Sequence, residues 1–342
     1  MSAEGRIHLP PSASEIASWT LAGLALILIL HLHVLAALIG GLAVYEIVHI
    51  LARRLHFIRG RREAGKFVAV GLLAMLIVAA LTLSILGVIA FFRSDQGNLP
   101  ALIGKMADII ETSREHLPAW LARELPANAD ELKNDLVLWL REHAGELQSI
   151  GADVGRAFIH ALIGMIIGAI VSLHEARPTT TRAPLADALA ARASRLGDAF
   201  RRIVFAQVRI SVLNTVLTAI YLLVVLPILG VRLPFTKTLI VITLLAGLLP
   251  VIGNLISNTI IFVVSLSHSL GVAVGALIFL IVIHKLEYFV NARIVGGEIK
   301  ARAWELLLAM LVMESAFGIA GLIAAPIYYA YLKAELSDRG LI

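Results

Sequence analysis

The segment LLAGLLPVIGNLISN, residues 244–258, decides how this chain is built. It lies inside a run from Thr238 to Ile283 that contains no Asp, Glu, Lys or Arg, so the run is apolar enough to enter a membrane. Pro250 removes a helical hydrogen bond, and Gly247 and Gly253 loosen the backbone on either side of it. A helix that only spans lipid needs no such break. The segment therefore predicts irregular backbone at membrane depth, which is tolerated only when it is buried in protein or lines a watery path.

The composition of all 342 residues agrees with a membrane location. Hydrophobic residues make up 59% of the chain and charged residues only 15%, which predicts an all-α polytopic membrane protein. The net charge of +5 comes from basic loops between apolar runs, which is typical of cytoplasmic loops and not of a nucleic-acid surface. The chain has no cysteine, and no catalytic, cofactor-binding or metal-binding constellation stands out. We therefore expect that the protein is not an enzyme and binds no cofactor or metal ion. His31 and His33, for example, cannot share a helical face and so do not form a pair of metal ligands.

Charge divides the first part of the chain into alternating segments. A cytoplasmic tail, residues 1–17, precedes three transmembrane helices within 18–92. The first two of these helices fold back on each other near HLH, residues 31–33, because one straight helix of that length would far exceed the bilayer core. A basic cytoplasmic loop at 53–66 follows them.

The rest of the chain alternates in the same way. Residues 93–156, rich in acids and with apolar residues at helical spacing, predict a small extracytoplasmic helical domain. The transmembrane transport region spans 157–335 and is interrupted by a basic cytoplasmic loop at 174–202. Its first helix carries small residues four apart for close helix packing, namely Gly164, Gly168 and Ser172. Residues 336–342 are a cytoplasmic C-terminal tail.

Two segments, 238–267 and 303–332, are too long for one crossing and too short for two full ones. The second has its own glycine break at Gly318 and Gly321. The chain therefore has six to eight transmembrane helices, including two broken or re-entrant segments. The basic loop from Asn291 to Arg302 favours the re-entrant arrangement, because it then lies in the cytoplasm, and either arrangement places both termini there.

Three stretches resemble a known family in order and spacing. LLAGLLPVIGNLI, HKLEYFVNARIVGGEI and FGIAGLIAAPIYYAYLKAEL are similar to the C-terminal half of the autoinducer-2 exporter family of permeases. Family members usually carry proline where Asn254 and often where Ala292 stand, and paired glycines within Met313–Ser315, which indicates a divergent branch. The resemblance implies a homo-oligomeric transporter in the plasma membrane of a bacterium.

Neutral polar residues mark a candidate substrate pathway. One set lies at i, i+4, i+7 and i+11 on an otherwise apolar helix, and the other surrounds the predicted break. Each set faces either a solute path or a neighbouring helix, and the break itself is either functional or a kink that fits helices together. The candidates are Gln207, Ser211, Asn214, Thr218, Pro250, Gly253, Asn254 and Asn258.

Three ionisable residues are candidates for proton or cation coupling. His284 and Glu287 share a helical face near a helix end, and the resemblance supports Glu287. The alternative is an interfacial ion pair of Glu287 with Lys285 or Arg293. Glu314 lies deeper in the last apolar segment, where a buried carboxyl group could carry a proton or serve as a hydrogen-bonded structural group.

These observations favour a permease or exporter of a small polar solute. The resemblance implies an autoinducer-2-like solute, and coupling to H⁺ or Na⁺ is a further hypothesis. One alternative is a cation–proton antiporter. Another is a non-transporting membrane scaffold that acts through its extracytoplasmic domain.

Overall fold

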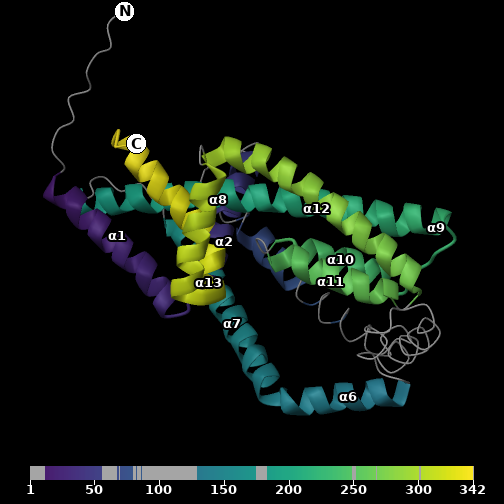
Figure 1. Ribbon diagram of the computed structural model, residues 1–342. Coiled ribbons are helices and arrows are strands. Elements are labelled where there is room, and N and C mark those ends of the chain that lie inside the picture. Colours follow the sequence, from purple (N-terminus) through teal and green to yellow (C-terminus); the bar gives the residue numbers. More distant parts are fainter. Residues whose placement is uncertain are drawn as a thin grey trace, which may run out of the picture. The chain divides into compact units, whose positions relative to one another are not determined.

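The computed structural model describes residues 12–55, 70–79, 129–174, 183–248, 252–266, 268–299 and 302–341, together with positions 68, 82 and 86. Within these residues every regular element is a helix (Figure 1). Five of the described helices are long and apolar enough to cross a membrane. The prediction of an all-α polytopic membrane protein is confirmed.

The helices are labelled in chain order, as in Figure 1. They are α1 (Ala13–His31), α2 (Leu35–Leu55), α6 (Ala129–Glu142), α7 (Ala144–His174), α8 (Pro184–Ile220), the π-helix η3 (Tyr221–Val225), α9 (Leu226–Ile228), α10 (Thr236–Ala246), α11 (Ile252–Leu266), α12 (Leu270–Ile299) and α13 (Ala303–Asp338). The chain forms two compact units. Unit 1 contains Met1–Val78, Asp153–Val204 and Gly296–Ile342, and unit 2 contains Ala79–Ala152 and Phe205–Val295.

The fold-back predicted at HLH is present between α1 and α2. Ser12 begins α1 as a capping box, in which its side chain accepts from the Glu15 amide while Glu15 bonds back to the Ser12 amide. The helix ends at His31, and His33 adopts a left-handed conformation with φ of 57°. This turn starts α2 after three residues.

Small residues let α2 and α7 touch through their backbones. A Cβ on Gly164 would lie 1.9 Å from the Ala37 carbonyl oxygen, and one on Gly168 would lie 2.2 Å from that of Gly41. Only glycine permits this approach, which is a common way for helices to pack in a membrane. The predicted role of Gly164 and Gly168 in close packing is confirmed.

The segment predicted as a basic cytoplasmic loop, 174–202, is helical from Pro184, where α8 begins, and its cytoplasmic side stays a prediction. Six arginines and the RPTTTRAP stretch favoured a solvated loop, but the helix pairs several of these charges. Arg201, for example, lies 3.7 Å from the buried carboxylate of Glu46 on α2. Because α8 begins at Pro184, it has a polar first half in unit 1 and an apolar second half in unit 2.

The second half of α8 passes directly into a π-helical turn. Pro227 has no N–H to continue an α-helical ladder, and the preceding Tyr221–Val225 widens to a π-helix in which the Leu226 amide donates to the Tyr221 carbonyl. Tyr221 is buried and stacks on Phe279 of α12 with ring centroids 3.9 Å apart. This stack belongs to the apolar core of unit 2.

The predicted extracytoplasmic domain, 93–156, lies outside the described residues up to position 128. From there α6 is amphipathic and is followed after one residue by α7. Residues Ala144–Gly155 of the predicted domain are therefore part of the helix that continues into the predicted membrane segment.

Candidate functional site

The opening segment of the sequence forms a helical hairpin in unit 2. The arms α10 and α11 lie side by side (Figure 1). The 11 residues of α10 rise only about 16 Å, roughly half the thickness of a bilayer core. A Cβ on Gly253 would lie 1.8 Å from the Ala246 carbonyl oxygen, so the arms meet backbone to backbone. The hypothesis of a broken, hairpin-like segment is confirmed; Pro250 itself lies outside the described residues.

Two residues of the α8 polar stripe bind the backbone at the end of α10. Gln207 Nε2 donates to the Gly247 carbonyl oxygen at 2.7 Å, and Ser211 Oγ donates to the Leu244 carbonyl oxygen at 2.6 Å. In a continuing helix Leu244 would accept from the Leu248 amide, which instead donates to Leu245. Gln207 and Ser211 thus satisfy carbonyl groups at the helix break.

The lack of a side chain at Gly247 permits this contact. A Cβ at position 247 would lie 2.6 Å from Ser211 Oγ and 2.8 Å from the Thr243 carbonyl oxygen. Gly247 and Gly253, the first and last residues of the Gly-Pro-Gly pattern, are therefore required for different reasons. Gly247 admits α8, and Gly253 admits the opposite arm.

The next stripe residue reaches the other arm of the hairpin. Asn214 Nδ2 donates to Asn254 Oδ1 at 3.1 Å, and Asn214 is only 5% exposed. Thr218, one turn further along α8, is buried as well, and Asn258 lies half-buried one turn beyond Asn254 on α11. The stripe and the broken segment, predicted separately, meet through Gln207, Ser211, Asn214 and Asn254. Helical spacing adds Thr218 and Asn258, and the six residues are named here the amide seam.

The second predicted break forms another hairpin, within α13 of unit 1. Gly318 has φ of 61° and ψ of −144°, so the chain reverses there. A Cβ on Gly321 would lie 1.9 Å from the Met313 carbonyl oxygen, which again requires arms in backbone contact. At the open end Lys333 Nζ lies 2.6 Å from Glu305 Oε2, and the Tyr329 hydroxyl donates to the same carboxylate. The beginning and the end of α13 therefore lie at the same end of the hairpin.

Of the three coupling candidates, the structure describes the side chain of Glu314 alone. Glu314 is exposed on the first arm of the α13 hairpin, one turn before Gly318. Its predicted position at membrane depth stays a prediction. His284 and Glu287 lie on α12, but their side chains are outside the described part of the chain. In the described residues no three His, Asp or Glu side chains gather closely enough to hold a metal ion.

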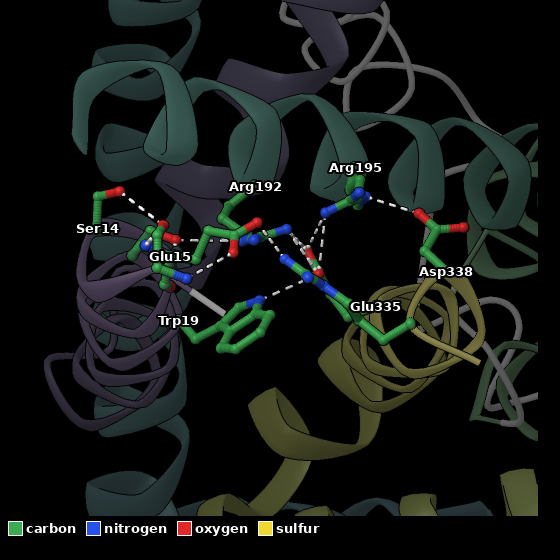
Figure 2. A network of polar contacts seen from close by, with 10 residues as sticks. Ser14, Glu15, Trp19, Arg192, Arg195, Glu335 and Asp338 are labelled. Atoms are coloured by element: carbon green, nitrogen blue, oxygen red, sulfur yellow. Dashed lines mark hydrogen bonds and ion pairs between the residues drawn. The ribbon is translucent and has the colours of Figure 1, made fainter. Parts of the chain in front are cut away.

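A buried ionic cluster in unit 1 was not predicted. Glu335 of α13 accepts from Trp19 of α1 and from Arg192 and Arg195 of α8 (Figure 2). We name it the Glu335 cluster: Trp19, Ser18, Arg192, Arg195 and Glu335, with Glu15, Asp338 and Arg339 at its rim. The sequence offered one signal, since Glu15, Ser18 and Trp19 share one face of α1, and Glu335, Asp338 and Arg339 share one face of α13.

The chemistry of the amide seam is that of neutral hydrogen bonding. Each of its six side chains is an amide or a hydroxyl, and none carries a charge at physiological pH. Such a seam can exchange hydrogen bonds with hydroxyl and carbonyl groups without the desolvation cost of a fixed charge.

Long apolar helices combined with two helical hairpins define a polytopic membrane protein with the broken segments typical of transporters. A family model described as AI-2E family transporter matches residues 16–338. The chain belongs to the AI-2E transporter family, which confirms the resemblance noted in the sequence. No curated protein and no solved structure matches the chain.

Proposed function

We propose that this protein is a permease for a small, polar, uncharged solute of the autoinducer-2 type, and that the amide seam borders the solute path. The observation that carries the proposal is the Asn214–Asn254 hydrogen bond at the break of a hairpin too short to cross the bilayer. This bond uses one donor of Asn214, whose amide has a second N–H and a carbonyl oxygen with which to contact a solute.

Within the seam the residues have different roles. Gln207 and Ser211 are positioning residues, because their hydrogen bonds go to the hairpin backbone. Asn214, Asn254 and Asn258 are the proposed solute contacts. A polyhydroxylated or carbonyl-bearing solute matches their donors and acceptors, whereas a metal cation has no carboxylate among them to bind.

Coupling to protons is the second part of the proposal. Glu314 lies nine residues after Glu305, about 13 Å further along the arm, and is exposed on the single chain. A carboxyl group at membrane depth is costly in lipid, so Glu314 faces either water or a second copy of the protein. Glu287 and His284 remain further coupling candidates. Cation–proton antiport is the alternative that uses the same groups.

The distribution of charge supports one orientation in the membrane. The basic loop at 53–66 favours the cytoplasmic side, and the hairpin of α13 returns the chain to the side from which it started. We therefore propose a multi-pass protein of a bacterial inner membrane with both termini in the cytoplasm.

The test is solute flux with purified protein in proteoliposomes. Autoinducer-2 and Na⁺ are offered separately, with and without a pH gradient. We expect autoinducer-2 flux that follows the gradient and loses its pH dependence in Glu314→Gln or Glu287→Gln. Sodium flux without autoinducer-2 flux would favour the antiporter, and no flux of either would contradict the permease.

A further inference from the structure

The amide seam ends within one turn on both of its helices. On α8 its last residue is Thr218, and Tyr221 follows three residues later. On α11 its last residue is Asn258, and Ile261 follows three residues later. Because residues three or four apart share a helical face, each face changes there from amide and hydroxyl groups to large, mainly apolar side chains.

The two changes occur at the same height along the helices. Asn214 of α8 donates to Asn254 of α11, and seven residues further along each helix Tyr221 and Ile261 belong to one buried cluster. Equal advances along both helices show that they run in the same direction here. The rise from the Asn214–Asn254 contact to this cluster is about 10 Å.

Buried apolar side chains from four helices close the seam at this height. Tyr221 stacks face to face on Phe279 of α12, with ring centroids 3.9 Å apart and an angle of 8° between the ring planes. Leu239 of α10 and Ile261 of α11 belong to the same cluster and are only 2% and 1% exposed. Apart from the Tyr221 hydroxyl, these side chains cannot form a hydrogen bond with a polar solute.

The helix that carries the stripe is irregular at the same point. The π-helix η3 begins at Tyr221, and Tyr221 and the adjacent Leu222 are both buried in the cluster. Single π-helical turns within α-helices are frequent at functional sites. The position of this turn, directly after Thr218, supports the Tyr221–Phe279 stack as the end of a site.

The opposite end of the seam is occupied by the protein itself. Gln207 and Ser211 donate to backbone carbonyl groups at the end of α10, so their donor groups are used. The side chains that remain for a solute are Asn214, Thr218, Asn254 and Asn258. They lie within the section of about 10 Å that ends at the stack, which suits one sugar-sized molecule rather than a longer chain.

We propose that the Tyr221–Phe279 stack is the floor of the solute site and sets the largest solute that the permease accepts. The inference rests on the proposed function, because it requires that the solute lies in the amide seam. A solute that fits above the floor keeps its hydrogen bonds to the amides, whereas a longer one must bury polar groups among apolar side chains. The competing account is an apolar core that only stabilises unit 2.

Flux in proteoliposomes tests the size limit. Autoinducer-2 and maltitol, a longer polyol, are offered separately to the parent protein and to Phe279→Ala. We expect the parent to pass autoinducer-2 and exclude maltitol. Phe279→Ala should raise the maltitol-to-autoinducer-2 flux ratio about tenfold or more, because the space left by the ring lengthens the site. The matched control is Leu226→Ala, which truncates a side chain of the same cluster further from the seam and should leave the ratio unchanged.

Thiol labelling tests the floor without transport. The chain contains no cysteine, so Asn258→Cys above the floor and Ile261→Cys at the floor are single probes in the full-length protein. In proteoliposomes a small charged methanethiosulfonate reagent should label Asn258→Cys at least about tenfold faster, because water hydrates the polar section and not the apolar layer. Adding Phe279→Ala should speed the labelling of Ile261→Cys, and adding Leu226→Ala should not.

Three results would overturn the floor: a flux ratio that Phe279→Ala leaves unchanged, a ratio that Leu226→Ala raises equally, or equal labelling of Asn258→Cys and Ile261→Cys. Absence of autoinducer-2 flux through the parent protein would instead overturn the permease function, and the labelling comparison would still show where the seam is closed to water. If Phe279→Ala elutes as aggregate in gel filtration, Phe279→Leu takes its place with the same expected direction.

Discussion

Gly253 lies so close to Ala246 that a single methyl group at position 253 would come within 1.8 Å of the Ala246 carbonyl oxygen. This contact joins the two arms of the α10–α11 hairpin at their backbones. A hairpin of arms this short can enter a bilayer but cannot cross it, and its end must lie in protein or beside a watery path.

Substitution of Gly253 should therefore open the hairpin. Gly253→Ala forces the arms apart or strains α11, and we expect a loss of about 1–3 kcal/mol of stability, measured as a lower Tm in detergent. The matched control is Gly275→Ala on α12, where an added Cβ would meet nothing within 4 Å. Equal Tm values for the two variants would contradict the close contact of the arms.

Removal of a stripe donor should also destabilise the hairpin. Ser211→Ala leaves the Leu244 carbonyl without its 2.6 Å hydrogen bond, and a buried unpaired carbonyl costs about 1–3 kcal/mol. Thr215→Val is the control, since Thr215 donates only to the Ser211 carbonyl of its own helix. We expect a lower Tm for Ser211→Ala than for Thr215→Val, and the reverse order would exclude the positioning role.

The Glu335 cluster predicts strong coupling between Arg192 and Glu335. Glu335→Leu alone leaves Arg192 buried without its carboxylate, at a cost of about 3–5 kcal/mol. The double variant Arg192→Met with Glu335→Leu should recover most of this loss, because both buried charges are gone. Asp153→Asn, in an ion pair that is about two-thirds exposed, should change the Tm little. Additive losses in the double variant would contradict direct pairing.

The α13 hairpin predicts a cross-link between residues far apart in sequence. Glu305 and Lys333 are in contact at 2.6 Å, so Glu305→Cys with Lys333→Cys should be joined by a short bifunctional thiol reagent in native membranes. In a straight helix these positions would lie about 42 Å apart. The control pair, Glu305→Cys with Leu322→Cys, places the second thiol near the turn and should not react. Cross-linking of the control pair but not of 305 with 333 would exclude the hairpin.

Much of this fold could be predicted from local sequence. Gly and Pro marked the α10–α11 hairpin, and glycines alone marked the α13 hairpin. The polar residues of α8 showed their helical spacing, and small residues marked the α2–α7 contact. These features depend on residues close together in the chain, where helical periodicity and backbone freedom are enough to infer the geometry.

The remaining features depend on contacts between distant segments. Nothing near Trp19 in the sequence indicates that Glu335 is its partner, since 316 residues separate them. Distant partners also explain why residues 174–202 were expected to form a loop. Arginines of this segment pair in the folded chain with Glu335, Asp338 and Glu46, which are far away in the sequence. Charge alone does not distinguish a loop from a helix whose charges are paired.

If the amide seam borders the solute path, replacing Asn214 by an apolar residue should reduce solute flux. Autoinducer-2 flux is measured in proteoliposomes for the parent protein, Asn214→Leu and Thr215→Val, after matching the amount of folded protein. We predict that Asn214→Leu lowers flux at least about tenfold, the effect of losing about 1.4 kcal/mol of solute contact, while Thr215→Val keeps it. Unchanged flux in Asn214→Leu would contradict the account and leave the seam as a purely structural contact.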